Sequence, residues 1–287
     1  MRLGLSLAFA AICCVLTSPA YAAGDVRHPH KQAWSFSKPL GGFDQASVQR
    51  GYQVYEEVCA ACHSLQALSY RNLGEKGGPF AAYEVRNHET GAPEVQIGPS
   101  AHGGKFISAN DNPAVKAIAA KFDVSEIDST TGDVVARPAR PADRFAAPFA
   151  NEAAARASNG GAYPPDLSVI NRARHGGADY LYALMTGYGE APLPGIEEVP
   201  GKYYNPYFRG GWIAMPPPLS PDRVTYADGT PATMDQMARD VSTFLEWAGD
   251  PKAELRKQMG IAVLGYLLAL TVLLFFAYRQ IWRGVKH

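Results

Sequence analysis

Apolar side chains recur at the spacing of an α-helix in three stretches along the middle of the chain. The first helix follows Asp44, a suitable N-cap, and its apolar face consists of Val48, Tyr52, Tyr55 and Cys59. The second lies between a capping box formed by Thr233 and Gln236 and a stop at Gly249, and its apolar face consists of Met237, Val241, Phe244, Leu245 and Ala248. A short third helix runs from Asp179 to Met185. The pattern predicts a core built from helices.

Two apolar segments lie at the ends of the chain. The first runs from Leu3 to Leu16 behind Arg2 and ends in the small-residue cleavage pattern Ala20-Tyr21-Ala22, which is typical of a bacterial general-secretion signal peptide. The second, residues 259–278, contains twenty consecutive residues without a charge and would span about 30 Å of hydrocarbon as a helix. We therefore predict one transmembrane helix, with a buried core helix as the alternative.

These segments predict how the chain is divided. Residues 1–22 form the signal peptide, 23–255 the periplasmic domain, 256–280 the transmembrane anchor helix and 281–287 the cytoplasmic tail. The export signal sets the orientation, because basic residues flank the anchor on both sides. The predicted location is the bacterial cytoplasmic (inner) membrane, single-pass, with the domain on the periplasmic side.

Composition and charge refine this picture. The 28 glycines and 22 prolines exceed ordinary usage, so we expect long loops that a large buried cofactor could organise. The whole chain is formally neutral, but residues 23–255 hold 21 basic and 27 acidic side chains. An acidic domain disfavours a nucleic-acid partner and favours a basic protein partner, although solubility alone explains the same balance.

Once the leader is removed, the remaining cysteines both lie in Cys59-Ala60-Ala61-Cys62-His63. A C-x-x-C-H sequence is typical of covalent c-type haem attachment. Residues three and four apart share a helix face, so both thiols can bond the porphyrin while the imidazole reaches the iron. The alternatives are a disulfide across a very small loop, a thiol-redox motif, which needs a βαβ setting, and a zinc site, which needs further ligands.

The second axial ligand of such a haem decides between electron transfer and ligand binding. Met215 is the main candidate, because Pro216, Pro217 and Pro218 restrict the loop that follows it. His175 is the rival ligand. A third interpretation is that Met215 only fills a gap in a proline-rich turn.

Several motifs occur in a fixed order between about Trp34 and Trp282. They are Phe43-Asp44, Cys59 to His63, Asn159 to Ser168, Arg172 to Tyr188, Tyr204 to Phe208, Met215 with its prolines, and Tyr226 to Trp247. Taken together, these motifs resemble cytochrome c1, the haem subunit of the cytochrome bc1 (quinol:cytochrome-c reductase) complex, in its bacterial type. Residues 83–150 fit no pattern, and no cysteine remains for the additional disulfide of some bacterial relatives.

The resemblance implies a mainly α fold: a class I cytochrome c-like haem domain with long loops, plus one C-terminal transmembrane helix. It also implies one covalently bound haem c, with thioethers at Cys59 and Cys62, iron ligands His63 and Met215, and Arg174 at a propionate. The other positions that match the family's haem pocket are Asn159, Ala162, Pro164, Pro165, Tyr180, Leu184, Ile213 and Pro218.

The implied function is electron transfer from the Rieske iron–sulfur protein through the haem to a cytochrome c, beside cytochrome b in the membrane. Glu56 and Glu57 are candidate acidic residues for steering a basic cytochrome. Two alternatives remain: a stand-alone membrane-anchored monohaem cytochrome, and a haem enzyme or sensor with an open sixth position.

Overall fold

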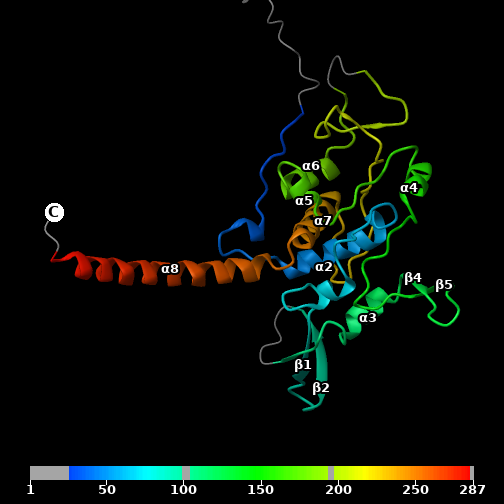
Figure 1. The fold of residues 1–287 in the computed structure, drawn as a ribbon. Helices are drawn as coiled ribbons and strands as arrows, with labels where there is room; N and C mark the ends of the chain where they lie inside the picture. The colour runs from blue at the N-terminus through cyan, green and yellow to red at the C-terminus, as the bar shows by residue number, and fades with distance from the viewer. Residues whose placement is uncertain (1–25, 99–103, 193–196, 285–287) are drawn as a thin grey trace, which may run out of the picture.

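The computed structural model describes residues 26–98, 104–192 and 197–284. The predicted signal peptide and the last three residues of the predicted tail lie outside these residues. The described part contains a helical domain and one long helix that extends away from it (Figure 1). The mainly α fold that the sequence predicts is confirmed.

Two helices cross at the centre of the domain. They are α2 (Gln45–Val54), which continues as a π-helical turn over Tyr55–Cys59, and α7 (Met234–Gly249). Gly51 lies at the crossing, where an added Cβ would come 2.0 Å from the backbone oxygen of Asp240. Glycine is therefore needed for the two backbones to approach this closely. Aromatic rings of Tyr52, Tyr55 and Phe244 fill the space around the contact.

Both predicted N-caps are present, but the predicted capping box of α7 is incomplete. Asp44 accepts a hydrogen bond from the backbone N–H of Ala46, and Thr233 accepts one from Gln236. Only half of the predicted capping box forms, because the Gln236 amide donates to Asp240 and the Thr233 N–H donates to Pro231. The side chain of Gln236 thus donates within α7, to the carboxylate that also accepts from Ser47 and Arg50 of α2, instead of closing the helix end.

Short helices surround this crossing. The helices α5 (Ile170–Ala173) and α6 (Ala178–Thr186) pack on α7, and α3 (Pro113–Ala119) packs on the 3-10 turn Tyr70–Gly74. The others are α4 (Glu152–Ser158) and the 3-10 turn Ser35–Ser37. The helix predicted from Asp179 to Met185 is confirmed as α6 with one more residue at each end.

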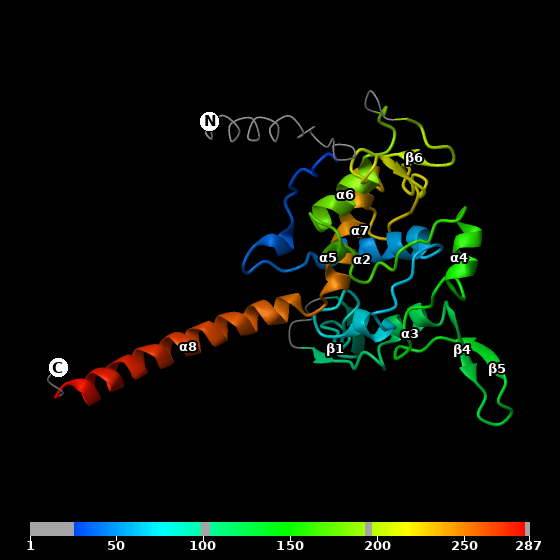
Figure 2. The ribbon, with the colours of Figure 1, turned by 45° about the horizontal axis from the view of Figure 1, so that its top comes forward.

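The stretch 83–150, which fits no sequence pattern, contributes most of the β-structure. Strands β1 (Ala82–Arg86), β2 (Pro93–Ile97) and β3 (Lys105–Phe106) form an antiparallel sheet in the order β2-β1-β3. Strands β4 (Asp123–Ile127) and β5 (Val134–Pro138) form a second hairpin. The β1–β2 hairpin projects from the helical core in Figure 1, and the β4–β5 hairpin projects from it in Figure 2. A third, two-residue pair joins β6 (Tyr203–Tyr204) to β7 (Trp212–Ile213).

The long helix α8 (Ala253–Trp282) has the mean hydropathy and length of a membrane span, and its 18-residue apolar window is not buried in the protein. The alternative of a buried core helix is therefore wrong. Only residues 250–252 separate α8 from α7. The first turns of α8 also hold the N-terminal segment: the ammonium of Lys257 donates to the backbone oxygens of Phe36, Lys38 and Gly41, at 2.6, 3.1 and 3.0 Å.

Candidate functional site

The C-x-x-C-H sequence follows directly from α2. The backbone N–H groups of Cys62 and His63 donate to the oxygen of Cys59, at 3.1 and 2.9 Å. This turn places the two thiols and the imidazole close together. Both cysteines are free and partly exposed, so each thiol remains available for a covalent bond.

The alternative interpretations of this pair lose support from the structure. Burial raises the pKa of the Cys59 thiol to about 12, and the neighbouring Cys62 adds to the effect. A thiol-redox motif needs the opposite shift, because the thiolate is its reactive form. No group of three or more His, Cys, Asp or Glu side chains arranged to hold a metal ion occurs in the described part of the chain, which disfavours zinc.

His63 is oriented by the segment that contains Pro164 and Pro165. Its Nδ1 lies 2.8 Å from the carbonyl oxygen of Pro165. Because a carbonyl oxygen can only accept, Nδ1 carries the proton and the lone pair of Nε2 is available to a metal. Burial lowers the pKa of His63, although Pro165 and Asp166 oppose the shift. The neutral imidazole is the form that ligates iron, so this side chain fits the predicted role.

Met215 lies just after β7, on a segment fixed at two points. The hydroxyl of Tyr188 donates to the backbone oxygen of Met215 at 3.1 Å. Upstream, Asn205 is fully buried. Its side chain donates to the backbone oxygen of Leu184 at 2.8 Å, and its backbone N–H donates to the backbone oxygen of Gly211 at 2.7 Å. The rival His175 is exposed in the turn before α6.

Arg174 is exposed at the end of α5 and donates to the neighbouring oxygen of Ala173. Within the described ranges it forms no ion pair with a carboxylate of the protein, so its charge is available to an external anion such as a propionate. Burial raises the pKa of Tyr180, and the adjacent Arg174 partly offsets this shift. The two side chains are therefore neighbours, as their predicted shared role requires.

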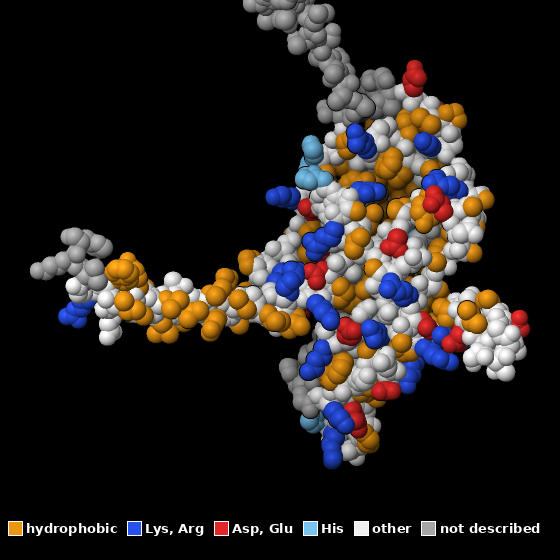
Figure 3. Space-filling model, in the orientation of Figure 1, with side chains coloured by type: hydrophobic (Ala, Val, Ile, Leu, Met, Phe, Trp, Pro, Cys, Tyr) orange, Lys and Arg blue, Asp and Glu red, His pale blue; other side chains and the backbone are white. Residues whose placement is uncertain are grey.

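The remaining predicted pocket residues lie on three segments. Asn159, Ala162, Pro164 and Pro165 follow α4, Leu184 is buried on α6, and Ile213 and Pro218 flank Met215. A small cavity of about 90 Å³ is lined by Cys62, Tyr163 and Pro164 among others. In the space-filling view, hydrophobic side chains gather between α6 and α4 (Figure 3). An apolar surface here fits a porphyrin face.

The structure changes the prediction for Glu56. Its carboxylate accepts from Lys121 at 2.9 Å through both oxygens, and from Tyr52 at 3.3 Å. Its side chain is only 15% exposed, so Glu56 is unsuited to steering a basic partner. Glu57 remains exposed and accepts from Gln53.

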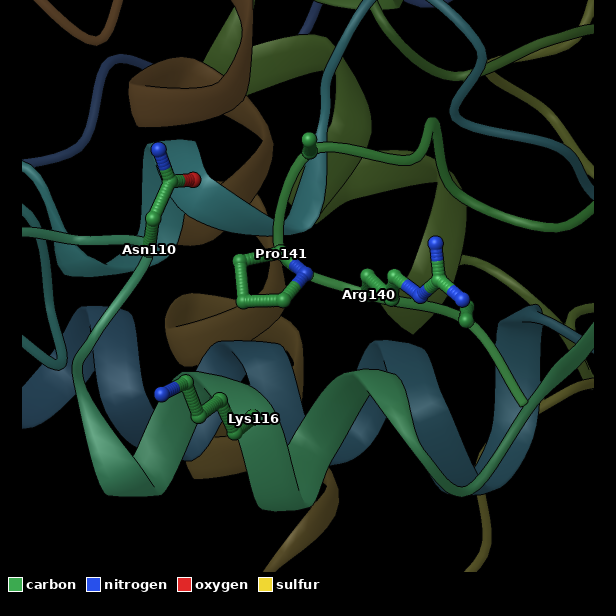
Figure 4. A pocket seen from close by; sticks show the side chains of 6 residues that line it. Asn110, Lys116, Arg140 and Pro141 are labelled. Atoms are coloured by element: carbon green, nitrogen blue, oxygen red, sulfur yellow. The ribbon is translucent and has the colours of Figure 1, made fainter.

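The sequence did not indicate three residues that connect the segments of the site: Asp166, which accepts from the hydroxyl of Ser64, and Tyr188 and Asn205, whose contacts are given above. Each lies inside a motif that the sequence displays, but its contact is distant along the chain. A larger surface pocket of about 440 Å³, lined by Asn110, Lys116 and residues 139–142, contains none of the predicted site residues (Figure 4).

Known proteins match most of this chain. The model of the Cytochrome C1 family matches residues 34–285. The chain is 40% identical over 272 residues to cytochrome c1, heme protein, mitochondrial, of Saccharomyces cerevisiae, covering 94% of this chain and 78% of the yeast protein. It is 39% identical to cytochrome c1 of Rhodospirillum rubrum, covering 90% and 89%. It is also 39% identical to the cytochrome b/c1 protein of Bradyrhizobium diazoefficiens, covering 88% of this chain and 35% of that protein.

Proposed function

The chain belongs to the cytochrome C1 family, and from this premise we propose that it carries electrons in a bc1 complex, from a Rieske iron–sulfur protein to a cytochrome c. Its cofactor is one covalently bound haem c. The haem, when bound, supplies an iron that takes up and releases one electron at a time. The protein makes and breaks no bond of a substrate in this role; it holds the haem, sets its potential and presents it to partners.

Each predicted site residue has a distinct task in this proposal. Cys59 and Cys62 would form the two thioethers, and His63 would bind iron through Nε2 while Pro165 holds Nδ1. Met215 would supply the second iron ligand from the protein, and its thioether would raise the potential because it favours reduced iron. Arg174 pairs with a propionate, since a partly buried carboxylate needs a charge-assisted partner. The remaining pocket residues exclude water from the porphyrin.

The observation that carries this proposal is the hydrogen bond between His63 Nδ1 and the oxygen of Pro165, at 2.8 Å. It fixes the tautomer that a metal requires and involves a residue 102 positions further along the chain. The disulfide and thiol-redox interpretations of the cysteine pair give no reason for this arrangement.

The anchor helix α8 attaches the domain to a membrane. We propose that this is the bacterial inner membrane and that residues 23–255 lie on the periplasmic side, because residues 1–22 have the pattern of an export signal. Cytochrome b is the proposed neighbour within the membrane. Support comes from the Bradyrhizobium relative, whose name joins cytochromes b and c1 in one protein, and from a Candida albicans relative named as a cytochrome b-c1 complex subunit.

The test is the ferric absorption spectrum of the full chain, purified with its haem, compared with Met215→Leu and with Met185→Leu as the matched control. Met185 packs against the core from α6. We expect the wild type and the Met185 variant to show the charge-transfer band of an Fe–S(Met) bond and Met215→Leu to lose it. High-spin iron in the wild type, or a band that survives Met215→Leu, would contradict the assignment. Purification without a b-type cytochrome would favour the stand-alone cytochrome.

A further inference from the structure

The carboxylate of Asp166 lies beside the segment that carries His63. Its Oδ2 accepts from the hydroxyl of Ser64 and from the backbone N–H of Gln66, both at 2.8 Å, and its Oδ1 accepts from the N–H of Ser168 at 2.8 Å. All three donors are neutral. Within the described ranges Asp166 forms no ion pair, so its charge is held by dipoles and is not cancelled by a cation.

Further hydrogen bonds join the same two segments. The N–H of Leu167 donates to the oxygen of Ser64, and the N–H of Ala67 donates to the hydroxyl of Ser168, both at 2.9 Å. With the Pro165–His63 contact, residues 63–67 and 165–168 are connected along their length. Asp166 makes two of these connections from a single oxygen. It is therefore the central acceptor that holds the loop after His63 in place.

The carboxylate is ionised at neutral pH. Burial by itself raises the pKa of Asp166, but hydrogen bonds from Gln66, Ser168 and Ser64 outweigh burial and bring it below its usual value. The carboxylate accepts from the hydroxyl of Ser64, the residue directly after His63, at 2.8 Å, so its charge lies close to the predicted iron ligand. A negative charge at this place favours the ferric state, because oxidation adds a positive charge to the iron.

We propose that Asp166 is a positioning residue for His63, and that its fixed negative charge also lowers the reduction potential of the haem iron. The inference rests on the proposed function, since it takes His63 as an iron ligand. It assigns to one residue both the orientation of the ligand loop and part of the control of the potential.

Asparagine tests this assignment with almost no change of shape. Its side chain carries one acceptor oxygen and one NH₂ group, whereas Asp166 faces backbone N–H groups on both sides. Whichever way Asp166→Asn is turned, its NH₂ faces the N–H of either Gln66 or Ser168. The substitution therefore removes the charge and one connection at once. Asp166→Glu keeps the charge and serves as the rescue variant.

The experiment is a redox titration of the full chain with its haem, for the wild type, Asp166→Asn, Asp166→Glu and Ser64→Ala. The matched control is Asp128→Asn, because Asp128 also accepts from backbone N–H groups but lies in the exposed turn between β4 and β5. We expect Asp166→Asn to lower the ferric-to-ferrous ratio at a fixed potential roughly tenfold, which is about 59 mV toward higher potential. Asp166→Glu should recover most of this shift, and Asp128→Asn should leave the ratio unchanged.

Ser64→Ala should shift the ratio in the opposite direction, about twofold, because it removes a dipole that partly offsets the charge. A general loosening of the loop predicts something else: it admits water, which lowers the potential in both variants. An unchanged or lowered potential in Asp166→Asn would overturn the inference. If that variant accumulates no haem, Ser64→Ala decides alone, and an unchanged potential there would overturn it.

A resonance Raman spectrum of the same samples separates this inference from the proposed function. The spin-state and coordination marker bands of the wild type report whether the haem iron has two strong ligands from the protein. If the wild type is not six-coordinate and low-spin, the proposed function fails and the inference fails with it. If the wild type is six-coordinate and low-spin while Asp166→Asn leaves the potential unchanged or lowers it, the inference alone is wrong.

Discussion

Tyr188 holds Met215 by its backbone: the phenol hydroxyl donates to the Met215 carbonyl oxygen at 3.1 Å. Burial raises the pKa of Tyr188, so the donor stays protonated. Tyr188→Phe should cost about 1 kcal/mol at this contact, which corresponds to a roughly fivefold larger fraction of molecules with the iron–methionine bond broken. The charge-transfer band measured against temperature checks this. Tyr203→Phe is the control, because Tyr203 is 44% exposed, and an equal effect there would contradict the assignment.

The crossing of α2 and α7 should not tolerate a methyl group at Gly51. An alanine Cβ would lie 2.0 Å from the Asp240 oxygen and 2.7 Å from Phe244 Cβ, and neither can move without separating the helices. We expect Gly51→Ala to destabilise the domain by about 3 kcal/mol, measured by thermal unfolding of the full chain in detergent. Gly260→Ala on α8 is the control, because its added methyl meets open space; similar melting of the two variants would refute the close contact.

Asp240 is the buried end of an ion pair that joins the same helices. Its side chain is fully buried and accepts from Ser47 at 2.6 Å, from Gln236 at 3.0 Å and from Arg50 at 2.9 Å. Asp240→Asn leaves the Arg50 charge without its buried partner and should cost about 3 kcal/mol or more. Asp228→Asn removes the 44% exposed partner of the same Arg50 and should cost at most about 1 kcal/mol. Equal losses of unfolding free energy in the two variants would show that the buried ion pair contributes no more than the exposed one.

Asp228 also predicts how the stability depends on pH. The backbone N–H of Thr230 and the Arg50 guanidinium lower the pKa of Asp228 from 3.8 to about 2. Because the folded pKa is the lower one, its stabilisation is complete above the unfolded value and disappears as pH falls from 3.8 toward 2. The stability difference between the wild type and Asp228→Asn should therefore shrink over this range. A difference that stays constant down to pH 2 would rule out this linkage.

The helical core could be predicted because its signals are local. The apolar faces of α2, α6 and α7 and the caps at Asp44 and Thr233 are all contained within a few turns. The π-helical widening at Tyr55–Cys59 has no such local signal. The strands between 82 and 138 were missed because β2 and β4 are exposed or half-exposed on both faces, and such strands lack the alternation that marks a buried face.

The candidate site likewise contains some residues that local sequence signals indicate and others that only the fold brings together. Cys59, Cys62 and His63 lie within five residues, so spacing alone identifies them. The contacts of Asp166 with Ser64 and of Glu56 with Lys121 join residues 102 and 65 positions apart, and only the folded chain brings them together. The acidic character of Glu56 was readable, but its neutralisation by Lys121 was not.

Only three residues separate α7 from α8, and Lys257 of α8 donates to three backbone oxygens of the domain. The domain therefore has no flexible linker that would let it rotate relative to α8. In the proposed membrane-anchored state, these contacts would keep the haem at a nearly fixed height above the bilayer. Electron tunnelling weakens steeply with distance, so under the proposed function the donor and the acceptor would have to come to this subunit. In this proposal the subunit is the stationary electron carrier, and its redox partners are the components that move.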